Sequence, residues 1–233
     1  MTRAFELVAR MASAVVAPIP VHLDSLLAFV LFSQSDIVPP TRETPLEKLR
    51  DCQLPLALVE ARGARITMCT SMLMGGASRG LTYQTRRRDA EDVDRLARSF
   101  CPSMGPGRER LRRIPLVEAS EVRFRGVGDV VEVASIVRHV RHLGKERGAG
   151  HGRVLEWTWR TVDDVDPVTV LLDEHGAALR HLPLEWCRET DGRTGLAAVE
   201  QPYWHPGRQR PAVLVGTRVG LHDDVVEAVR SCR

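Results

Sequence analysis

Four glycines within nine residues make residues 143–154 the segment that most restricts how this chain can fold. Glycine has no Cβ atom, so the backbone there can turn sharply, adopt positive φ angles and approach a ligand closely. Cationic side chains alternate with these glycines, which makes a polyanion the expected ligand. The positions are Gly144, Lys145, Arg147, Gly148, Gly150, His151, Gly152 and Arg153. The sequence predicts that this segment, named here the glycine loop, binds phosphate groups through its amides and side chains.

Repeating apolar positions predict a helix before the glycine loop and a strand after it. Valines recur at helical spacing from Val130 to Val140, behind Asp129, a residue type that caps helix N-termini. We expect this helix to continue to residue 142, with cations in its last turn and Gly144 as the C′ residue that ends it. Residues 155–160 alternate between apolar and polar side chains, which is typical of a strand.

The apolar patterns of the whole N-terminal part predict an α+β domain. Asp24 and Ser25 are candidate caps for its first helix. The expected elements are strands at residues 5–17, 56–60, 65–73, 122–125 and 155–160, and helices at 26–34 and 129–142. Counted as one strand that is broken at Gly63, residues 56–60 and 65–73 complete the βαββαβ order of a ferredoxin-like (RRM-like) fold.

An insertion and an extension complete the expected domain organisation. The domain covers residues 1–166, and residues 75–115 interrupt it with a segment that is rich in arginine and poor in core-forming side chains. Residues 167–233 form an extension that is expected to pack on the domain. Residues 168–172 and 212–215 in this extension predict further strands.

Basic residues concentrate in the middle of the chain. Residues 79–153 hold 17 Lys and Arg against 10 Asp and Glu, whereas the whole chain has a net charge of only +3. A basic region on a mildly acidic body is typical of a protein that binds a phosphate backbone. Further candidate RNA-binding residues are Tyr83, Arg86, Arg87, Arg88, Arg123 and Arg125. Guanidinium groups beside an aromatic ring commonly grip single-stranded RNA; the alternative is a solvated surface run.

The sequence lacks the motifs of several other chemistries. It has no P-loop, dinucleotide-binding fingerprint, GxSxG or HExxH motif, and its five cysteines are scattered, so we expect no metal, cofactor or disulfide framework. Histidines could supply a general acid or base for RNA cleavage, although none stands in a diagnostic arrangement. They are His22, His139, His142 and His151. The longest apolar run, residues 26–32, is too short for a bilayer, and we expect a soluble cytoplasmic protein.

Three segments resemble motifs of the RAMP superfamily of CRISPR-associated RNA-binding proteins. Residues 21–28, VHLDSLLA, are similar to the HLDxLLA opening of the Cas5-like subunit of type IV systems. Residues 143–157, LGKERGAGHGRVLEW, resemble the GKxRxxGxGRVxxW segment of the same family. Residues 123–129, RFRGVGD, resemble its run into the second helix. The likeness covers about residues 5–162.

The resemblance implies a non-catalytic subunit of a type IV CRISPR ribonucleoprotein complex, active in antiviral defense and plasmid interference. Such subunits bind the 5′ repeat-derived handle of the crRNA, cap the backbone of Cas7-like subunits and lay their insertion over the RNA as a thumb. The matched glycine-loop positions would contact the RNA or shape that contact. Further implied partners are a large zinc-binding subunit and a helicase recruited to the complex, with target DNA reached indirectly and no membrane.

Two other hypotheses stay open at this point. One is a repeat-specific, metal-independent endoribonuclease that processes pre-crRNA, because such an enzyme shares the fold and the loop. The other is an enzyme that acts on a small phosphate or nucleotide.

Overall fold

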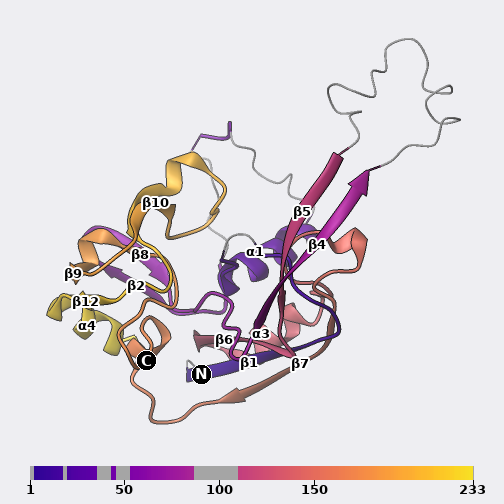
Figure 1. The fold of residues 1–233 in the computed structure, drawn as a ribbon. Helices are drawn as coiled ribbons and strands as arrows, with labels where there is room; N and C mark the ends of the chain where they lie inside the picture. Colours follow the sequence, from indigo (N-terminus) through magenta and orange to yellow (C-terminus); the bar gives the residue numbers. More distant parts are fainter. Residues whose placement is uncertain (1–2, 18–19, 36–42, 46–52, 87–109, 233) are drawn as a thin grey trace, which may run out of the picture.

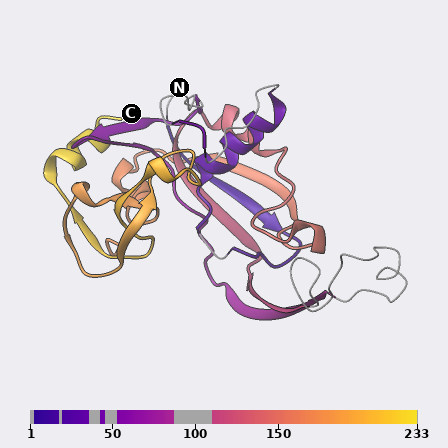
Figure 2. The same ribbon diagram turned by 90° about the horizontal axis from the view of Figure 1, so that it is seen from above.

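The computed structural model describes residues 3–17, 20–35, 43–45, 53–86 and 110–232. This part of the chain is a mixed α/β structure with several small antiparallel sheets and three α-helices. Figures 1 and 2 show two lobes beside each other and a two-stranded ribbon that projects away from the body. No helix in the described ranges has the length and apolar character needed to cross a membrane.

The sheet of the N-terminal lobe has β1 in its centre. β1 (Arg3–Met11) pairs antiparallel with β6 (Glu121–Gly128) on one side and with β7 (Val154–Thr161) on the other. Alternate residues of β1, among them Phe5 and Leu7, are buried and belong to the core of this lobe. The three strands predicted from period-2 alternation are therefore present, although the first ends at Met11 and not at residue 17.

Two helices cover the buried face of this sheet. α1 (Leu23–Gln34) and α3 (Val130–Val137) contribute Leu27 and Val133 to the same core as Phe5 and Phe124. The intervening residues of the strands, Glu6 on β1 for example, point to the opposite face. The sheet thus has a helix-covered face and a second face that carries charged side chains.

α1 begins three residues earlier than predicted, and its expected caps do not cap it. The N-cap is His22, which makes no capping hydrogen bond through its side chain. Asp24 is fully buried inside the first turn, because its carboxylate lies 3.5 Å from the guanidinium group of Arg180. Asp24 therefore pairs with a residue that is distant in sequence and does not cap the helix. The local sequence pattern gives no sign of this ion pair.

The two strands predicted between α1 and the insertion form a hairpin of their own. β2 (Leu58–Ala61) pairs with β3 (Ala64–Thr67) across a turn at Arg62 and Gly63, both of which have positive φ angles. The chain beyond β3 then runs antiparallel to β6, with bridges from Cys69 to Gly126 and from Leu73 to Arg123. The segment 69–73 therefore lies next to β6, on the side away from β1.

α3 ends five residues before the predicted end of its helix. It stops at Val137, with Arg138 as the C-cap, and its last turn holds no basic residue. Val140 and Leu143 are nevertheless buried in the core, so an irregular turn maintains the apolar spacing that predicted a longer helix. Gly144 is not a C′ residue either. A Cβ atom at Gly144 would lie 2.4 Å from the Val16 carbonyl oxygen, so close backbone approach is what requires glycine there.

The predicted insertion contains a long two-stranded ribbon. β4 (Ser78–Arg86) pairs antiparallel with β5 (Arg110–Glu118) over their whole length. Both strands project from the body in Figure 1. Arg87 and Arg88, predicted to contact RNA, lie outside the described residues, and of Arg86 only the backbone is described.

The C-terminal lobe is built from short elements. They are η4 (Pro167–Val170), β8 (Leu182–Pro183), η5 (Leu184–Trp186), β9 (Cys187–Thr190), β10 (Thr194–Ala198), η6 (Pro206–Arg208), β11 (Gln209–Val213), β12 (Val219–Leu221) and α4 (Asp223–Arg230). The predicted strand at 168–172 is wrong: Asp166 accepts a hydrogen bond from the Val168 amide and starts a 3-10 turn, with Pro167 at its first position. The strand predicted at 212–215 exists but begins earlier, at Gln209.

The second hydrophobic core joins this lobe to the β2–β3 hairpin. Trp186 is fully buried and its indole N–H donates to the Ala61 carbonyl at 2.7 Å. Val59 and Ile66 of the hairpin belong to the same core as the C-terminal strands. A hairpin that precedes the ribbon in sequence is therefore part of the packing of residues 167–232.

Candidate nucleic-acid interface

The glycine loop is anchored to the chain segment that follows β1. The Lys145 amide donates to the Val16 carbonyl at 2.7 Å, and the Gly152 amide donates to the Ala14 carbonyl at 2.8 Å. Ser13 holds the far side of the loop, since its hydroxyl donates to the Gly150 carbonyl and accepts from the Arg153 amide. The loop is thus a fixed part of the lobe and not a free excursion.

Many of the loop amides are engaged within the protein. Ala149, Gly150 and His151 donate to carbonyls of Glu146 and Arg147, which forms the 3-10 turn η3 (Arg147–Ala149). Together with the amides of Lys145, Gly152 and Arg153, these donors have partners in the chain. In this conformation a ligand would meet the charged side chains of the loop rather than its amides.

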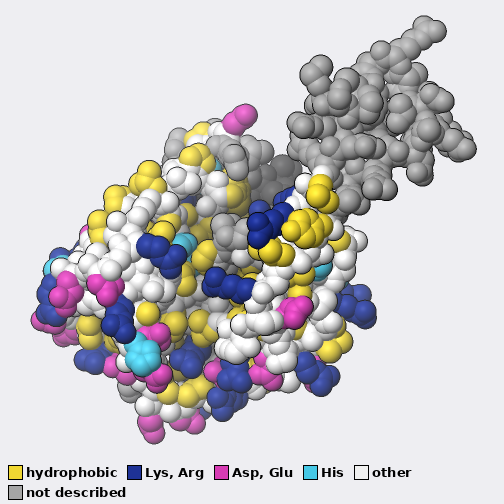
Figure 3. Space-filling model, in the orientation of Figure 1, with side chains coloured by type: hydrophobic (Ala, Val, Ile, Leu, Met, Phe, Trp, Pro, Cys, Tyr) yellow, Lys and Arg dark blue, Asp and Glu magenta, His cyan; other side chains and the backbone are white. Residues whose placement is uncertain are grey.

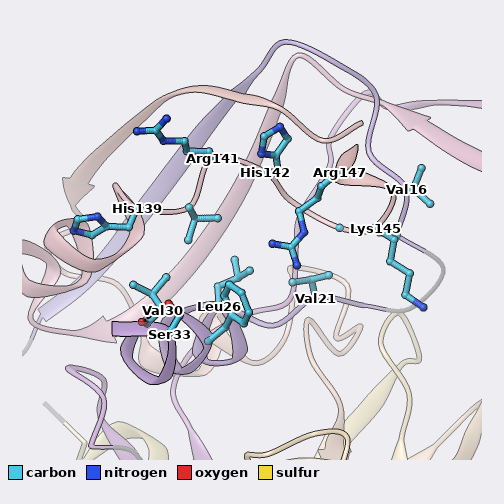
Figure 4. A pocket seen from close by; sticks show the side chains of 14 residues that line it. Val16, Val21, Leu26, Val30, Ser33, His139, Arg141, His142, Lys145 and Arg147 are labelled. Carbon is cyan, nitrogen blue, oxygen red and sulfur yellow. Dashed lines mark hydrogen bonds between the residues drawn. The ribbon is translucent and has the colours of Figure 1, made fainter. Parts of the chain in front are cut away.

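A pocket of about 360 Å³ lies between α1 and the glycine loop, a size in the range of small-ligand sites. Figure 4 shows Arg147 reaching from the loop toward the helix, and Arg141 and His142 on the far side. Its lining residues are Val16, Ala17, Val21, Leu26, Phe29, Val30, Ser33, His139, Val140, Arg141, His142, Gly144, Lys145 and Arg147. Among these described lining residues none is acidic. The pocket combines an apolar wall with a cationic rim, which suits a ligand that has both a flat apolar part and a phosphate.

An aromatic ring and a guanidinium group meet at the mouth of this pocket. The Arg147 Cζ atom lies 5.3 Å from the centroid of the Phe29 ring, within the range of a cation–π contact. Phe29 is 54 % exposed although it lies on a helix that consists mostly of apolar residues. The sequence predicts a buried helix and gives no signal that singles out Phe29, because only the fold shows which side of α1 stays uncovered.

An ion pair connects the ribbon to the glycine loop. Arg112 on β5 lies 2.7 Å from the Glu146 carboxylate, and Glu146 has a left-handed backbone conformation with φ of 56°. Glu146 is therefore held by both its unusual backbone and its partner. No sequence pattern predicts this contact, since 34 residues separate the two side chains.

The predicted site residues of β6 lie on the other face of the sheet. Val122 and Phe124 are buried under the helices, so Arg123 and Arg125 point to the opposite face. Arg123 pairs with Glu121 at 2.9 Å, and Arg125 lies 3.6 Å from Glu6. The structure therefore does not bring these two arginines into the pocket.

Tyr83 also lies away from the pocket, on the ribbon. Its ring is 60 % exposed, and its strand position is opposite Arg113. Leu81 and Leu111 are exposed on the same ribbon. Figure 3 shows hydrophobic and basic side chains next to each other at the base of this ribbon. Tyr83 thus has Arg113 as its cross-strand neighbour, on a surface separate from the pocket, whereas the side chains of the arginines at 86–88 predicted to accompany it lie outside the described residues.

A buried polar cluster lies beneath α1, where the two lobes meet. The Tyr203 hydroxyl donates to the Asp24 carboxylate at 2.7 Å, and Arg180 donates to the Val199 carbonyl at 2.8 Å and to the Thr67 carbonyl. The His22 ring stacks on the Tyr203 ring with centroids 4.7 Å apart. Burial and the neighbouring Arg180 hold the pKa of His22 well below its usual value.

His22 is therefore a neutral, inaccessible ring. It is 3 % exposed, and neither ring nitrogen has a hydrogen-bond partner in the described part of the chain. A general acid or base must reach the proton that it transfers. His22 does not reach the surface, whereas His139 and His142 line the pocket and His151 lies in the loop. The described residues also contain no group of three His, Cys, Asp or Glu side chains that could hold a metal ion.

A comparison with protein families finds a match that includes the glycine loop. No curated protein matches the sequence. The sequence model of the family described as CRISPR type IV associated protein Csf3 matches residues 65–214. This match covers β3, the ribbon, α3 and the glycine loop, and it continues into the C-terminal lobe, beyond the region of the resemblance noted from the sequence. The chain therefore belongs to the type IV CRISPR-associated Csf3 family.

Proposed function

We propose that this chain is a non-catalytic subunit of a type IV CRISPR effector complex and binds the 5′ repeat-derived handle of the crRNA. The pocket between α1 and the glycine loop carries this proposal. It offers three cations, Arg141, Lys145 and Arg147, beside the exposed ring of Phe29. Single-stranded RNA is bound by such combinations, since bases stack on rings and guanidinium planes while phosphates meet the charges.

The strand arrangement supports a ferredoxin-like RAMP fold for this subunit. Segment 69–73, β6, β1 and β7 follow one another across the sheet, and each neighbour is antiparallel to the next. Two helices lie on one face, each placed between two of these strands in sequence. This corresponds to the split βαβ units of that fold. The ribbon would then be the base of the thumb.

Family membership supports a place in a type IV complex, and the partners are assigned from it. We assign the Cas7-like backbone as the neighbour that this subunit caps, with the large zinc-binding subunit in the same assembly. The helicase and target DNA would be reached through the complex. The exposed ribbon is the described element that extends furthest from the body, and it is available for such contacts.

A pair of alanine substitutions tests the RNA-binding role. Arg141→Ala with Arg147→Ala removes two exposed cations from the pocket rim, so we expect roughly tenfold weaker binding of a repeat-derived handle RNA and a salt slope reduced by about two. The matched control is Arg188→Ala with Arg218→Ala, which removes two exposed arginines from the C-terminal lobe. Fluorescence anisotropy over a salt series measures both. Equal affinities of the two double variants would contradict the proposal.

The absence of catalysis needs its own test. The burial of His22 supports a binding role, because this ring does not meet a 2′-hydroxyl group in the folded chain. We expect labelled repeat RNA to stay intact with the pure protein in EDTA. A specific cleavage product that is lost in His151→Ala or His142→Ala would make the chain a processing endoribonuclease instead.

A further inference from the structure

β7 is an edge strand whose outer side is open from Leu155 to Thr161, whereas the amide of its first residue, Val154, donates to the Arg141 carbonyl at 2.9 Å. Among the described strands it has β1 as its sole neighbour, and six of its eight residues are exposed. The Val162 amide donates to the Ala4 carbonyl, and hydrogen-bonded pairs then recur at every second residue of an antiparallel ladder. The N–H and C=O groups of Trp157, Trp159 and Thr161 therefore point away from β1. An open edge of this kind is a template for another strand.

The sequence of this edge is complementary to itself. Read outward from Thr158, the strand has a tryptophan on each side, and then Glu156 on one side and Arg160 on the other. An antiparallel copy centred on Thr158 places Glu156 opposite Arg160 of the second copy, and Arg160 opposite the second Glu156. Opposite charges in directly facing positions stabilise a strand pair, whereas like charges destabilise it.

The backbone geometry fits the same register. Centring on Thr158 places Trp157 opposite Trp159 of the second copy, and both residues have outward-pointing backbone groups. Trp157 and Trp159 of the two copies would therefore form hydrogen-bonded backbone pairs on both sides of the two-fold axis. Thr158 faces its own copy in a non-hydrogen-bonded position, where side chains come closest.

The side chains beside the edge are largely exposed. Trp159 is 46 % and Leu155 is 55 % exposed, so a partner strand would cover apolar surface. Glu156 contacts Arg10 at 3.4 Å and Arg160 contacts Glu6 at 2.9 Å, but their side chains remain 54 % and 70 % exposed. Each can therefore hold its partner within the chain and still face the second copy.

We infer that the free chain forms a symmetric dimer by antiparallel pairing of β7 with β7 of a second copy. Such a contact is isologous, since the same patch serves both copies, and closure removes the open edge that would otherwise recruit other strands. The inference is independent of the RNA-binding proposal, because β7 contributes no residue to the pocket between α1 and the glycine loop.

Charge reversal tests the register. Sedimentation velocity of the full chain over a concentration series should show a monomer–dimer equilibrium. Glu156→Arg replaces two attractions by two repulsions and should weaken the dimer roughly tenfold or more. The double variant Glu156→Arg, Arg160→Glu recreates the complementary pattern and should restore it. Glu174→Arg, an equal charge change at an exposed turn, is the control and should leave the dimer unchanged.

A cysteine at the two-fold axis tests the geometry without disturbing the charges. Facing residues in a non-hydrogen-bonded pair have Cα atoms about 4.5 Å apart, a separation that a disulfide bridges. Thr158→Cys should therefore yield a covalent dimer under mild oxidation. Thr161→Cys lies on the same strand, but its two copies would be on the order of 20 Å apart and should not cross-link. A monomer at all concentrations, or equal cross-linking of the two variants, would overturn the inference.

Discussion

Gly152 is the residue on which the shape of the glycine loop depends most directly. Its φ angle is +69°, and a Cβ atom there would lie 1.9 Å from the Leu143 carbonyl oxygen. Gly148, four residues earlier, has open space around it and no positive φ angle. Two glycines of one motif therefore have different roles. Gly152 determines the backbone conformation of the loop, whereas Gly148 lies at a surface turn where a side chain would have space.

These environments predict opposite results for two alanine substitutions. Gly152→Ala should cost roughly 2 kcal/mol or more of unfolding free energy, because the side chain meets a backbone carbonyl and prefers another φ angle. Gly148→Ala should change stability by less than about 1 kcal/mol. Urea unfolding followed by circular dichroism measures both. A loss for Gly148→Ala as large as that for Gly152→Ala would show that the loop has a different conformation.

His181 and His22 make stability depend on pH. Burial, with Arg180 nearby, lowers the pKa of His181 to about 4, below the usual value of 6.5. The unfolded chain therefore binds more protons than the folded chain between pH 6.5 and 4. Stability should be complete above pH 6.5 and fall as the pH drops toward 4. His181→Asn should flatten this dependence, whereas exposed His175→Asn should not. Urea unfolding midpoints of the unmodified chain and of the two variants, measured at several pH values, test this prediction. Equal pH slopes in all three proteins would contradict the assignment of the pH dependence to His181.

The contact between β5 and the glycine loop gives the ribbon a role in positioning the loop. Arg112 and Glu146 form an ion pair at 2.7 Å, and the Glu146 side chain is only 19 % exposed. A partly exposed pair of this kind contributes at most about 1 kcal/mol, so the expected effect is local and not global. The ribbon would then adjust the loop without being needed for the fold.

Loss of the Arg112 side chain should loosen the loop selectively. In Arg112→Ala we expect faster hydrogen exchange at the amides of residues 145–152 and an RNA affinity lowered by a few fold, with the midpoint of unfolding little changed. Arg113→Ala is the matched control, since Arg113 is the next residue on β5 and points to the other face of the ribbon. Equal exchange in both variants would remove the positioning role.

Sequence patterns predicted strands and helices well where a local rule applies. The alternation was sufficient in β1 and β6 because one face of each is buried, and in β7 because Val154 and Trp157 pack against the same core. The rule failed for residues 138–142, because an irregular turn that buries Val140 and Leu143 imitates helical spacing. It also failed for Asp24, whose partner Arg180 is 156 residues away. The pocket could be predicted only in part, because Phe29 and Glu146 acquire their roles from neighbours that are distant in sequence.

The two lobes depend on each other for stability. Asp24 of α1 and Arg180 of the C-terminal lobe are both fully buried, and Tyr203 donates to the same carboxylate. The β2–β3 hairpin packs into the core of the C-terminal lobe. Removing one member of a buried pair leaves the other charge without a partner, which costs about 3 to 5 kcal/mol.

A chain that ends at Asp166 should accordingly fail to fold independently. It would leave Asp24 buried without Arg180 and would expose Val59 and Ile66 of the hairpin. We expect aggregation, or loss of the cooperative unfolding transition. Arg180→Ala in the full chain isolates the ion pair and should lower stability by about 3 kcal/mol or more. A soluble, cooperatively unfolding fragment 1–166 would show that the N-terminal lobe is autonomous.

The location of RNA on the protein is the most direct test of the proposed function. Ultraviolet cross-linking of a repeat-derived handle RNA to the full chain, followed by mass spectrometry, identifies the peptides in contact. The pocket between α1 and the glycine loop predicts cross-links in the peptides that contain Phe29 and residues 139–147. Cross-links confined to the C-terminal lobe, or to the face of the sheet that carries Arg123 and Arg125, would contradict it.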